Sequence, residues 1–167
     1  MEKQRLTDKE VKDYIYELYL KHKAIYISKT GENATAYNDA GFARMLLKVS
    51  KNNPSVLDTI KRVAPSIDVG DILVYSRRGD IFCGAVIITR KAIFWKKTFS
   101  LSPSAIKLSE IQRFSWEDDM NQGGTWSMHI WLKNGSFWNA AKSIGDYLPK
   151  QAVDFLNEML EFLQNNQ

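Results

Sequence analysis

The hydrophobic pattern of this chain changes its period at Pro65. Before that residue, apolar side chains recur every three or four positions, the spacing that places them on one face of a helix. After it, apolar and polar residues alternate in short runs separated by turn-forming residues, as in antiparallel strands. The change predicts an α+β protein with two parts: a helical N-terminal segment, residues 1–66, and a β-rich domain, residues 67–167.

Three helices are predicted before Pro65. The first begins with a capping-box pattern, Thr7 followed by Glu10, in which each side chain can accept the backbone N–H of the other residue. The apolar run at 24–27 is interpreted as a short strand, and residues 41–49 as the second helix. Asn53 before Pro54 is typical of an N-cap followed by proline at the first helical position, so the third helix is expected from Pro54 to Pro65, with Val56, Leu57, Ile60 and Val63 buried.

About seven short strands follow, and a helix closes the chain. Asn134-Gly135 is the strongest hairpin signal, and it predicts a type I′ turn with positive φ at both residues. Pro149 suits the first turn of the last helix, whose buried stripe is Val153, Leu156, Leu160 and Leu163. This order predicts a strongly bent antiparallel sheet or a small barrel closed at one end by the helix. The strands are expected at 72–75, 81–89, 92–97, 106–108, 111–117, 126–132 and 136–141.

Four stretches carry a resemblance to a known fold. They are GAVIITRKAIFW at 84–95, IKLSEIQRFSW at 106–116, MHIWLKNGSFW at 128–138 and AVDFLNEMLEFL at 152–163. Through them, residues 68–163 resemble the PH-like superfamily, in particular its GRAM and bacterial PH-like branches. The resemblance implies a seven-stranded bent barrel capped by a C-terminal helix, which serves as a scaffold for binding lipids, peptides or copies of itself. Residues 1–66 lie outside it.

Composition narrows the location and the class of partner. The 44% hydrophobic and 25% charged residues are typical of a globular protein. Cys83 is the single cysteine, so no internal disulfide can form, and no apolar run approaches the roughly 20 residues of a spanning helix. A cytoplasmic protein is expected, with a peripheral membrane position as the alternative. The net charge of +4 lacks a strong basic stripe, so nucleic acid is not expected as a partner, although residues 39–65 outline a helix–turn–helix.

The strand at 126–132 supplies the candidate partner-binding residues. His129 and Trp131 alternate with Met128, Ile130 and Leu132, which are expected to face the core, so they should share the outer face with Lys133. An exposed tryptophan favours a protein interface, because indole is enriched at binding hot spots. The alternative is that a helix from residues 1–66 covers this face.

Basic residues at the strand ends suggest a second kind of site. Arg77, Arg78, Lys96 and Lys97 could meet at one end of the sheet and bind the phosphate of a lipid, while Arg90 and Lys91 would lie at the other end. The phosphoinositide-binding members of the PH-like superfamily carry a second basic pair in the next strand, which is absent here. Charges at turns are more often simply solvated.

Catalysis has little support in the sequence. No nucleophile, zinc or phosphate-loop motif is present, and a pair formed by Cys83 and His129 across the sheet is only a remote alternative. The acidic run at 117–119 lacks the ligand spacing of a calcium loop. No catalytic residue, metal or cofactor is therefore expected.

The predicted function is a non-catalytic binding module that engages a protein partner or a second copy of itself. Binding to anionic lipid and inhibition of a partner enzyme, as in bacterial immunity proteins, are the alternatives.

Overall fold

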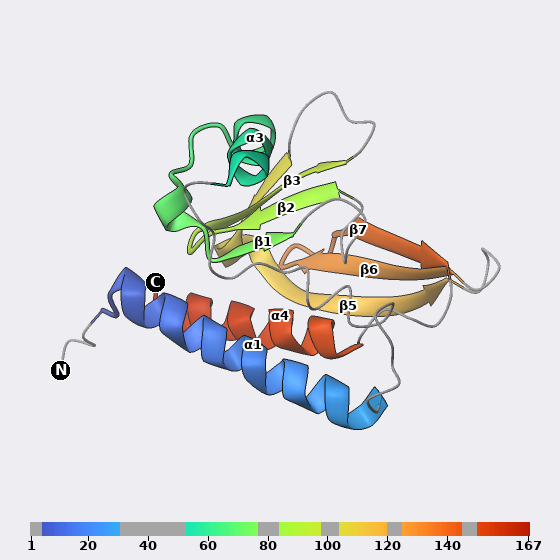
Figure 1. Ribbon diagram of the computed structural model, residues 1–167. Coiled ribbons are helices and arrows are strands. Elements are labelled where there is room, and N and C mark those ends of the chain that lie inside the picture. Colours follow the sequence, from blue (N-terminus) through green and yellow to red (C-terminus); the bar gives the residue numbers. More distant parts are fainter. Residues whose placement is uncertain (1–4, 31–52, 77–83, 98–103, 120–124, 145–149) are drawn as a thin grey trace.

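The computed structural model describes residues 5–30, 53–76, 84–97, 104–119, 125–144 and 150–167. Its strands form two antiparallel sheets, with the hydrogen-bonded orders β1-β2-β3-β4 and β5-β6-β7, and its helices pack around them (Figure 1). The α+β class is confirmed. Within the described residues no strand pairing joins the two sheets into a closed barrel.

The elements are α1 (Asp8–Thr30), α3 (Pro54–Val63), β1 (Val74–Ser76), β2 (Gly84–Ile88), β3 (Ala92–Lys97), β4 (Ser104–Lys107), β5 (Ile111–Asp119), β6 (Thr125–Leu132), β7 (Phe137–Ile144) and α4 (Lys150–Asn165), with 3-10 turns η1 (Val69–Asp71) and η2 (Leu108–Glu110).

Helix α1 begins at the predicted capping box. The Thr7 N–H donates to Glu10 Oε2 at 2.8 Å, and the Glu10 N–H donates to Thr7 Oγ1 at 3.3 Å. The helix continues to Thr30, so the predicted strand at 24–27 is wrong. Its apolar run belongs to the helix because Tyr26 extends the buried stripe of Tyr19 and His22 at helical spacing. The helix predicted at 41–49 lies outside the described residues.

Helix α3 covers one face of the first sheet. The predicted cap is confirmed, since Asn53 Oδ1 accepts the Ser55 N–H at 3.1 Å. Ile60 and Val63 are buried, but Leu57 is 37% exposed, contrary to the sequence prediction. The helix packs on β2 and β3. Its contact forms a second apolar cluster of Ile60, Val63, Ala64, Ile72, Tyr75 and Ile87.

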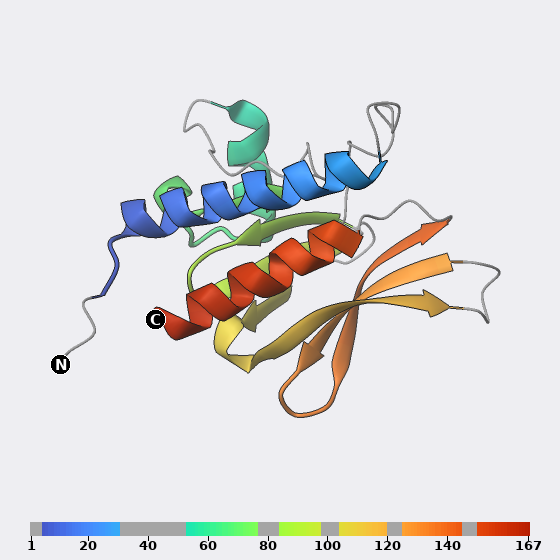
Figure 2. The same ribbon diagram turned by 90° about the horizontal axis from the view of Figure 1, so that it is seen from below.

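The main core lies between the inner faces of both sheets and the helix pair α1 and α4. Figure 2 shows the two helices running side by side across the sheets, and the two are in direct contact. Both helices, both sheets and η2 contribute to one continuous cluster, and the predicted stripe of α4 is buried in it. Its fully buried members include Val11, Ile15, Ile88, Ile93, Leu108, Ile111, Met128, Phe155, Leu156 and Met159.

Two amides of α4 satisfy backbone groups of β5 and of the preceding turn η2. Asn157 accepts the Phe114 N–H at 2.7 Å and donates to the Phe114 carbonyl at 2.9 Å. Gln164 donates to the carbonyls of Leu108 and Ile111 at 2.7 and 2.8 Å. These side-chain bonds occupy backbone groups of β5 that a neighbouring strand would otherwise bond. An incoming chain could therefore not pair with β5 at Phe114 without displacing α4.

The hairpin between β6 and β7 forms where predicted, but its turn type differs. Gly135 has a φ of 87°, but no described residue other than a glycine has a positive φ. Asn134 therefore has a negative φ, which excludes a type I′ turn. The Gly135 N–H donates to the Leu132 carbonyl and the Leu132 N–H to that of Ser136, at 3.0 and 2.9 Å. This pattern matches a three-residue loop in which glycine takes the left-handed position.

The turn type fixes which side chains share a face. If Asn134 and Gly135 alone formed the turn, Lys133 would pair with Ser136, and two positions further along the strands Trp131 would pair with Trp138. The observed register pairs Trp131 with Phe137 and Ile130 with Trp138. Phe137 therefore lies on the outer face, and Trp138 contacts the buried Trp95 with ring centroids 5.6 Å apart.

Candidate functional site

The outer face of the β5–β7 sheet carries the aromatic side chains that the sequence singled out. Along β6, Met128 and Ile130 are buried in the core, while His129 and Trp131 lie on the opposite face and are half-buried. Phe137 joins them from β7 and is 49% exposed. We call His129, Trp131 and Phe137 the aromatic face. Its position on one side of the sheet follows directly from strand alternation.

The three rings of the aromatic face hold one another in place. Phe137 stacks on His129 with centroids 4.4 Å apart and lies 4.9 Å from Trp131. Trp131 donates its indole N–H to Ser115 Oγ at 2.8 Å, and Ser115 donates to Glu117 Oε1 at 2.7 Å. These contacts orient the indole before any partner arrives, which lowers the entropy cost of binding.

Arg113 adds a positive charge beside these rings. Its guanidinium carbon lies 5.0 Å from the centroid of Trp131, within the range of a cation–π interaction. The side chain comes from β5, where Arg113 pairs with Trp131 across the strands. Tryptophan and arginine together are the residue types most enriched at protein-binding hot spots.

Sequence reasoning identified part of this arrangement. Trp131 and His129 lie on the predicted face, but Lys133 lies beyond the strand, exposed in the hairpin turn, where its backbone N–H donates to the Glu110 carbonyl at 2.9 Å. Phe137 and Arg113 were missed. The glycine in Asn134-Gly135 was the available signal for Phe137, because the loop length that it allows sets the register.

Neither α1 nor α3 has its main contacts on the aromatic face, and the helix predicted at 41–49 lies outside the described residues. Helix α1 packs on α4, and α3 packs on β2 and β3. The first sheet therefore has apolar contacts on both faces, through the main core and through α3. Of the described helices of residues 1–66, neither has its principal contacts on the outer face of the β5–β7 sheet.

The strand topology places Lys96 and Lys97 at the opposite end of the first sheet from Arg90 and Lys91. Lys96 and Lys97 pair through the backbone with Ala85 and Gly84, at the end of the sheet where β1 also finishes. Arg90 and Lys91 lie at the other end, in the turn between β2 and β3. Arg77 and Arg78 lie outside the described residues, as do the side chains of Lys96 and Lys97.

Arg90 has a structural role at its end of the sheet. It donates to Asp8 Oδ1 at 2.7 Å, to the Leu6 carbonyl at 3.2 Å and to the Asn166 carbonyl at 3.0 Å. One guanidinium thereby links the start of α1, the β2–β3 turn and the end of α4. The hydrogen bond from Arg90 holds the pKa of the Asp8 carboxyl below its usual value.

The structure describes only some of the remaining chemical candidates. Cys83 is outside the described residues. His22 is buried, with Nε2 2.6 Å from Glu158 Oε2. Across the described ranges, no three His, Cys, Asp or Glu side chains are grouped as a metal site. Nor does any described helix combine the length and apolar character needed to cross a bilayer. Arg62 of the candidate recognition helix pairs with Asp58 at 3.1 Å.

Comparisons with known proteins identify no relative. The chain matches no protein-family model, no curated protein and no solved structure.

Proposed function

We propose that residues 67–167 form a PH-like domain and that the protein is a non-catalytic, cytoplasmic binding module. A four-stranded and a three-stranded antiparallel sheet, followed by a helix packed in the core between them, support this assignment. The four sequence stretches that resemble the superfamily fall on β2 with β3, on β4 through β5, on β6 with β7, and on α4.

The partner in this proposal is another protein, bound at the aromatic face. The observation that carries it is a cluster on one sheet face: Phe137, 49% exposed and stacked on His129, lies 4.9 Å from Trp131, and the Arg113 guanidinium lies over that indole. An ordered, accessible aromatic ring gains apolar contact area on binding and loses little conformational freedom. Arg113 and Trp131 beside it favour a partner surface with an apolar side chain at its centre and a carboxylate at its rim.

Site-specific photo-crosslinking tests this proposal. A crosslinking amino acid at position 137 is expected to give a discrete protein adduct in cells, whereas the same group at Tyr14 is not. Tyr14 is a suitable control because it is an aromatic residue of α1, 44% exposed and stacked on Phe162. Trp131→Ala should reduce the adduct by about tenfold or more, the usual cost of losing a hot-spot aromatic residue.

Other outcomes distinguish the alternatives. An adduct of twice the chain mass, with a concentration-dependent mass in light scattering, would identify the partner as a second copy. Equal adducts from positions 137 and 14 would contradict a specific face. Salt-sensitive binding to anionic vesicles that is lost in Arg77→Glu with Arg78→Glu, and kept in Phe137→Ala, would favour the membrane hypothesis instead.

A further inference from the structure

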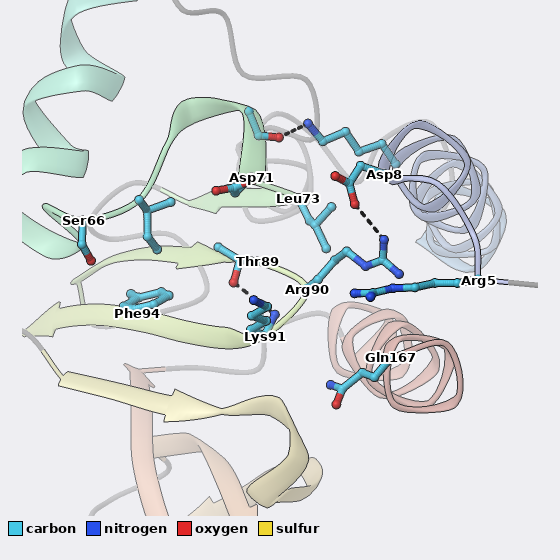
Figure 3. A pocket seen from close by; sticks show the side chains of 13 residues that line it. Arg5, Asp8, Ser66, Asp71, Leu73, Thr89, Arg90, Lys91, Phe94 and Gln167 are labelled. Carbon is cyan, nitrogen blue, oxygen red and sulfur yellow. Dashed lines mark hydrogen bonds and ion pairs between the residues drawn. The ribbon is translucent and has the colours of Figure 1, made fainter.

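A cavity of about 460 Å³ opens at the end of the molecule opposite to Lys96 and Lys97. It lies between the start of α1, the β2–β3 turn and the segment around η1, and Figure 3 shows the side chains that line it. The volume is within the range of small-molecule sites. Its charged lining residues are Arg5, Asp8, Lys12, Asp71, Arg90 and Lys91.

The charge of the cavity is unbalanced. Four basic side chains face two side-chain carboxylates, so cations are in excess among the lining side chains. Arg90 is engaged by Asp8 and two carbonyls, and Lys12 donates to the Gly70 carbonyl. The side chains of Arg5 and Lys91 make no hydrogen bond or ion pair with another described residue, and both are exposed.

The electrostatic field around Asp8 shows the same excess. The hydrogen bond from Arg90 and the charges of Arg90, Lys12 and Arg5 all act to lower the Asp8 pKa. Asp8 and Asp71 together cannot neutralise the four cations of the lining, so like charges are left facing a shared space. In Figure 3 the side chain of Arg5 extends toward Arg90, and Lys91 lies on the other side of Arg90. An anion placed among them would relieve this repulsion.

The remaining lining gives the cavity an apolar wall. Leu73 is buried, and Ile67 and Phe94 are half-buried. An apolar wall beside excess cations favours a ligand with an anionic group and a hydrocarbon or aromatic body. Arginine binds phosphate through a planar pair of N–H donors, and lysine adds a mobile point charge.

We propose that this cavity binds an organic phosphate. The phosphate lies between Arg5 and Lys91, and the organic body contacts Ile67, Leu73 and Phe94. Arg90 holds the walls of the site together and adds its charge to the field. This site is independent of the aromatic face and lies at the opposite end of the first sheet from Lys96 and Lys97. The same chemistry is found in free phosphate monoesters and in the phosphate headgroup of a lipid.

Calorimetric titration of the whole chain with phenyl phosphate and with inorganic phosphate tests the site. Saturable binding of phenyl phosphate is expected with one site per chain, and weaker binding of inorganic phosphate, which cannot use the apolar wall. Arg5→Ala and Lys91→Ala should each weaken the affinity by about tenfold. Both residues are exposed, so these variants should fold. Lys133→Ala removes a charge from the β6–β7 hairpin turn, which does not line the cavity, and should bind as the wild type does.

Absence of saturable binding, or an equal loss in Lys133→Ala, would overturn the site, since the second result would indicate nonspecific attraction to net charge. Vesicles with and without phosphatidic acid identify the source of the phosphate. Vesicle binding that Arg5→Ala and Lys91→Ala abolish supports a lipid headgroup at this cavity. Phenyl phosphate binding without vesicle binding supports a free phosphate monoester. Either result leaves the crosslinking test of the aromatic face unaffected.

Discussion

At the scale of single residues, two adjacent basic side chains of one turn serve different purposes. Arg90 and Lys91 are adjacent, and the sequence treated them as equivalent basic residues. Arg90 turns inward, with its side chain 17% exposed, and bonds to both ends of the described chain. Lys91 stays in solvent. The guanidinium suits the inward role because its donors diverge in a plane and reach several carbonyl and carboxylate oxygens at once.

Arg90→Ala should therefore lower the free energy of unfolding by about 2–3 kcal/mol, because the Leu6 and Asn166 carbonyls lose a charged donor. Lys91→Ala should change it by less than about 0.5 kcal/mol, as exposed substitutions usually do. Urea denaturation of the two variants measures the difference. If Arg90→Ala unfolded at the same urea concentration as Lys91→Ala, the proposed link between the chain ends would be wrong.

At the scale of elements, α1 is attached to α4 by a polar joint beside the apolar core. Glu158 accepts from Lys21 at 2.9 Å and lies 2.6 Å from His22. The hydrogen bond from Lys21, followed by that from His22, lowers the Glu158 pKa below its ordinary value of 4.5. On the same pair of helices, Tyr14 stacks on Phe162 at 3.9 Å.

This joint predicts an acid-dependent loss of stability. Because the Glu158 pKa is lower in the folded state, the unfolded chain binds the proton more readily. The stabilisation is complete above about pH 4.5 and declines as the pH falls through the lower pKa of the folded state. Glu158→Gln should cost up to about 1 kcal/mol at neutral pH, after allowance for solvent screening of a partly exposed pair.

Thermal unfolding from pH 7 to pH 3 measures this effect. The difference between wild type and Glu158→Gln should shrink as the pH falls below 4.5. Glu161→Gln is the matched control, an exposed carboxyl on the same helix. A difference that persisted unchanged at pH 3 would show that Glu158 acts through packing and not through its charge.

At the scale of the whole molecule, α1 is part of the domain core even though the resemblance begins after it. Val11, Ile15 and Tyr26 belong to the same buried cluster as β2, β3 and α4. Ile15→Ala should cost about 2–5 kcal/mol, the usual range for a buried cavity. Leu20→Ala, on the same helix but 40% exposed, should cost much less.

Denaturation followed by far-UV circular dichroism and by tryptophan fluorescence tests whether this core is shared. The two signals should shift together in Ile15→Ala, because Trp95 lies in the cluster that α1 covers. A helical signal that melts at lower denaturant than the fluorescence signal would show instead that α1 unfolds as a separate unit.

The sequence by itself determined the kinds of elements and most of their order. Periodicity and local caps specify them, since the capping of α1 involves Thr7 and Glu10 alone and β3 begins and ends where alternation placed it. Periodicity also placed Trp131 opposite to the core. These features depend on residues that are close together in the sequence, within one helical turn or one strand, so sequence patterns can predict them.

The tertiary structure alone decided the contacts between distant segments. An apolar run at 24–27 suits a strand or a helix, and packing of Tyr26 in the core selects the helix. One turn conformation at Gly135 assigns Phe137 to the outer face, because a shift of one residue reverses every side chain of a strand. The cavity of Arg5, Lys12, Arg90 and Lys91 joins residues up to 86 positions apart. No local pattern encodes such a site, since its charges meet only after α1 packs beside the β2–β3 turn.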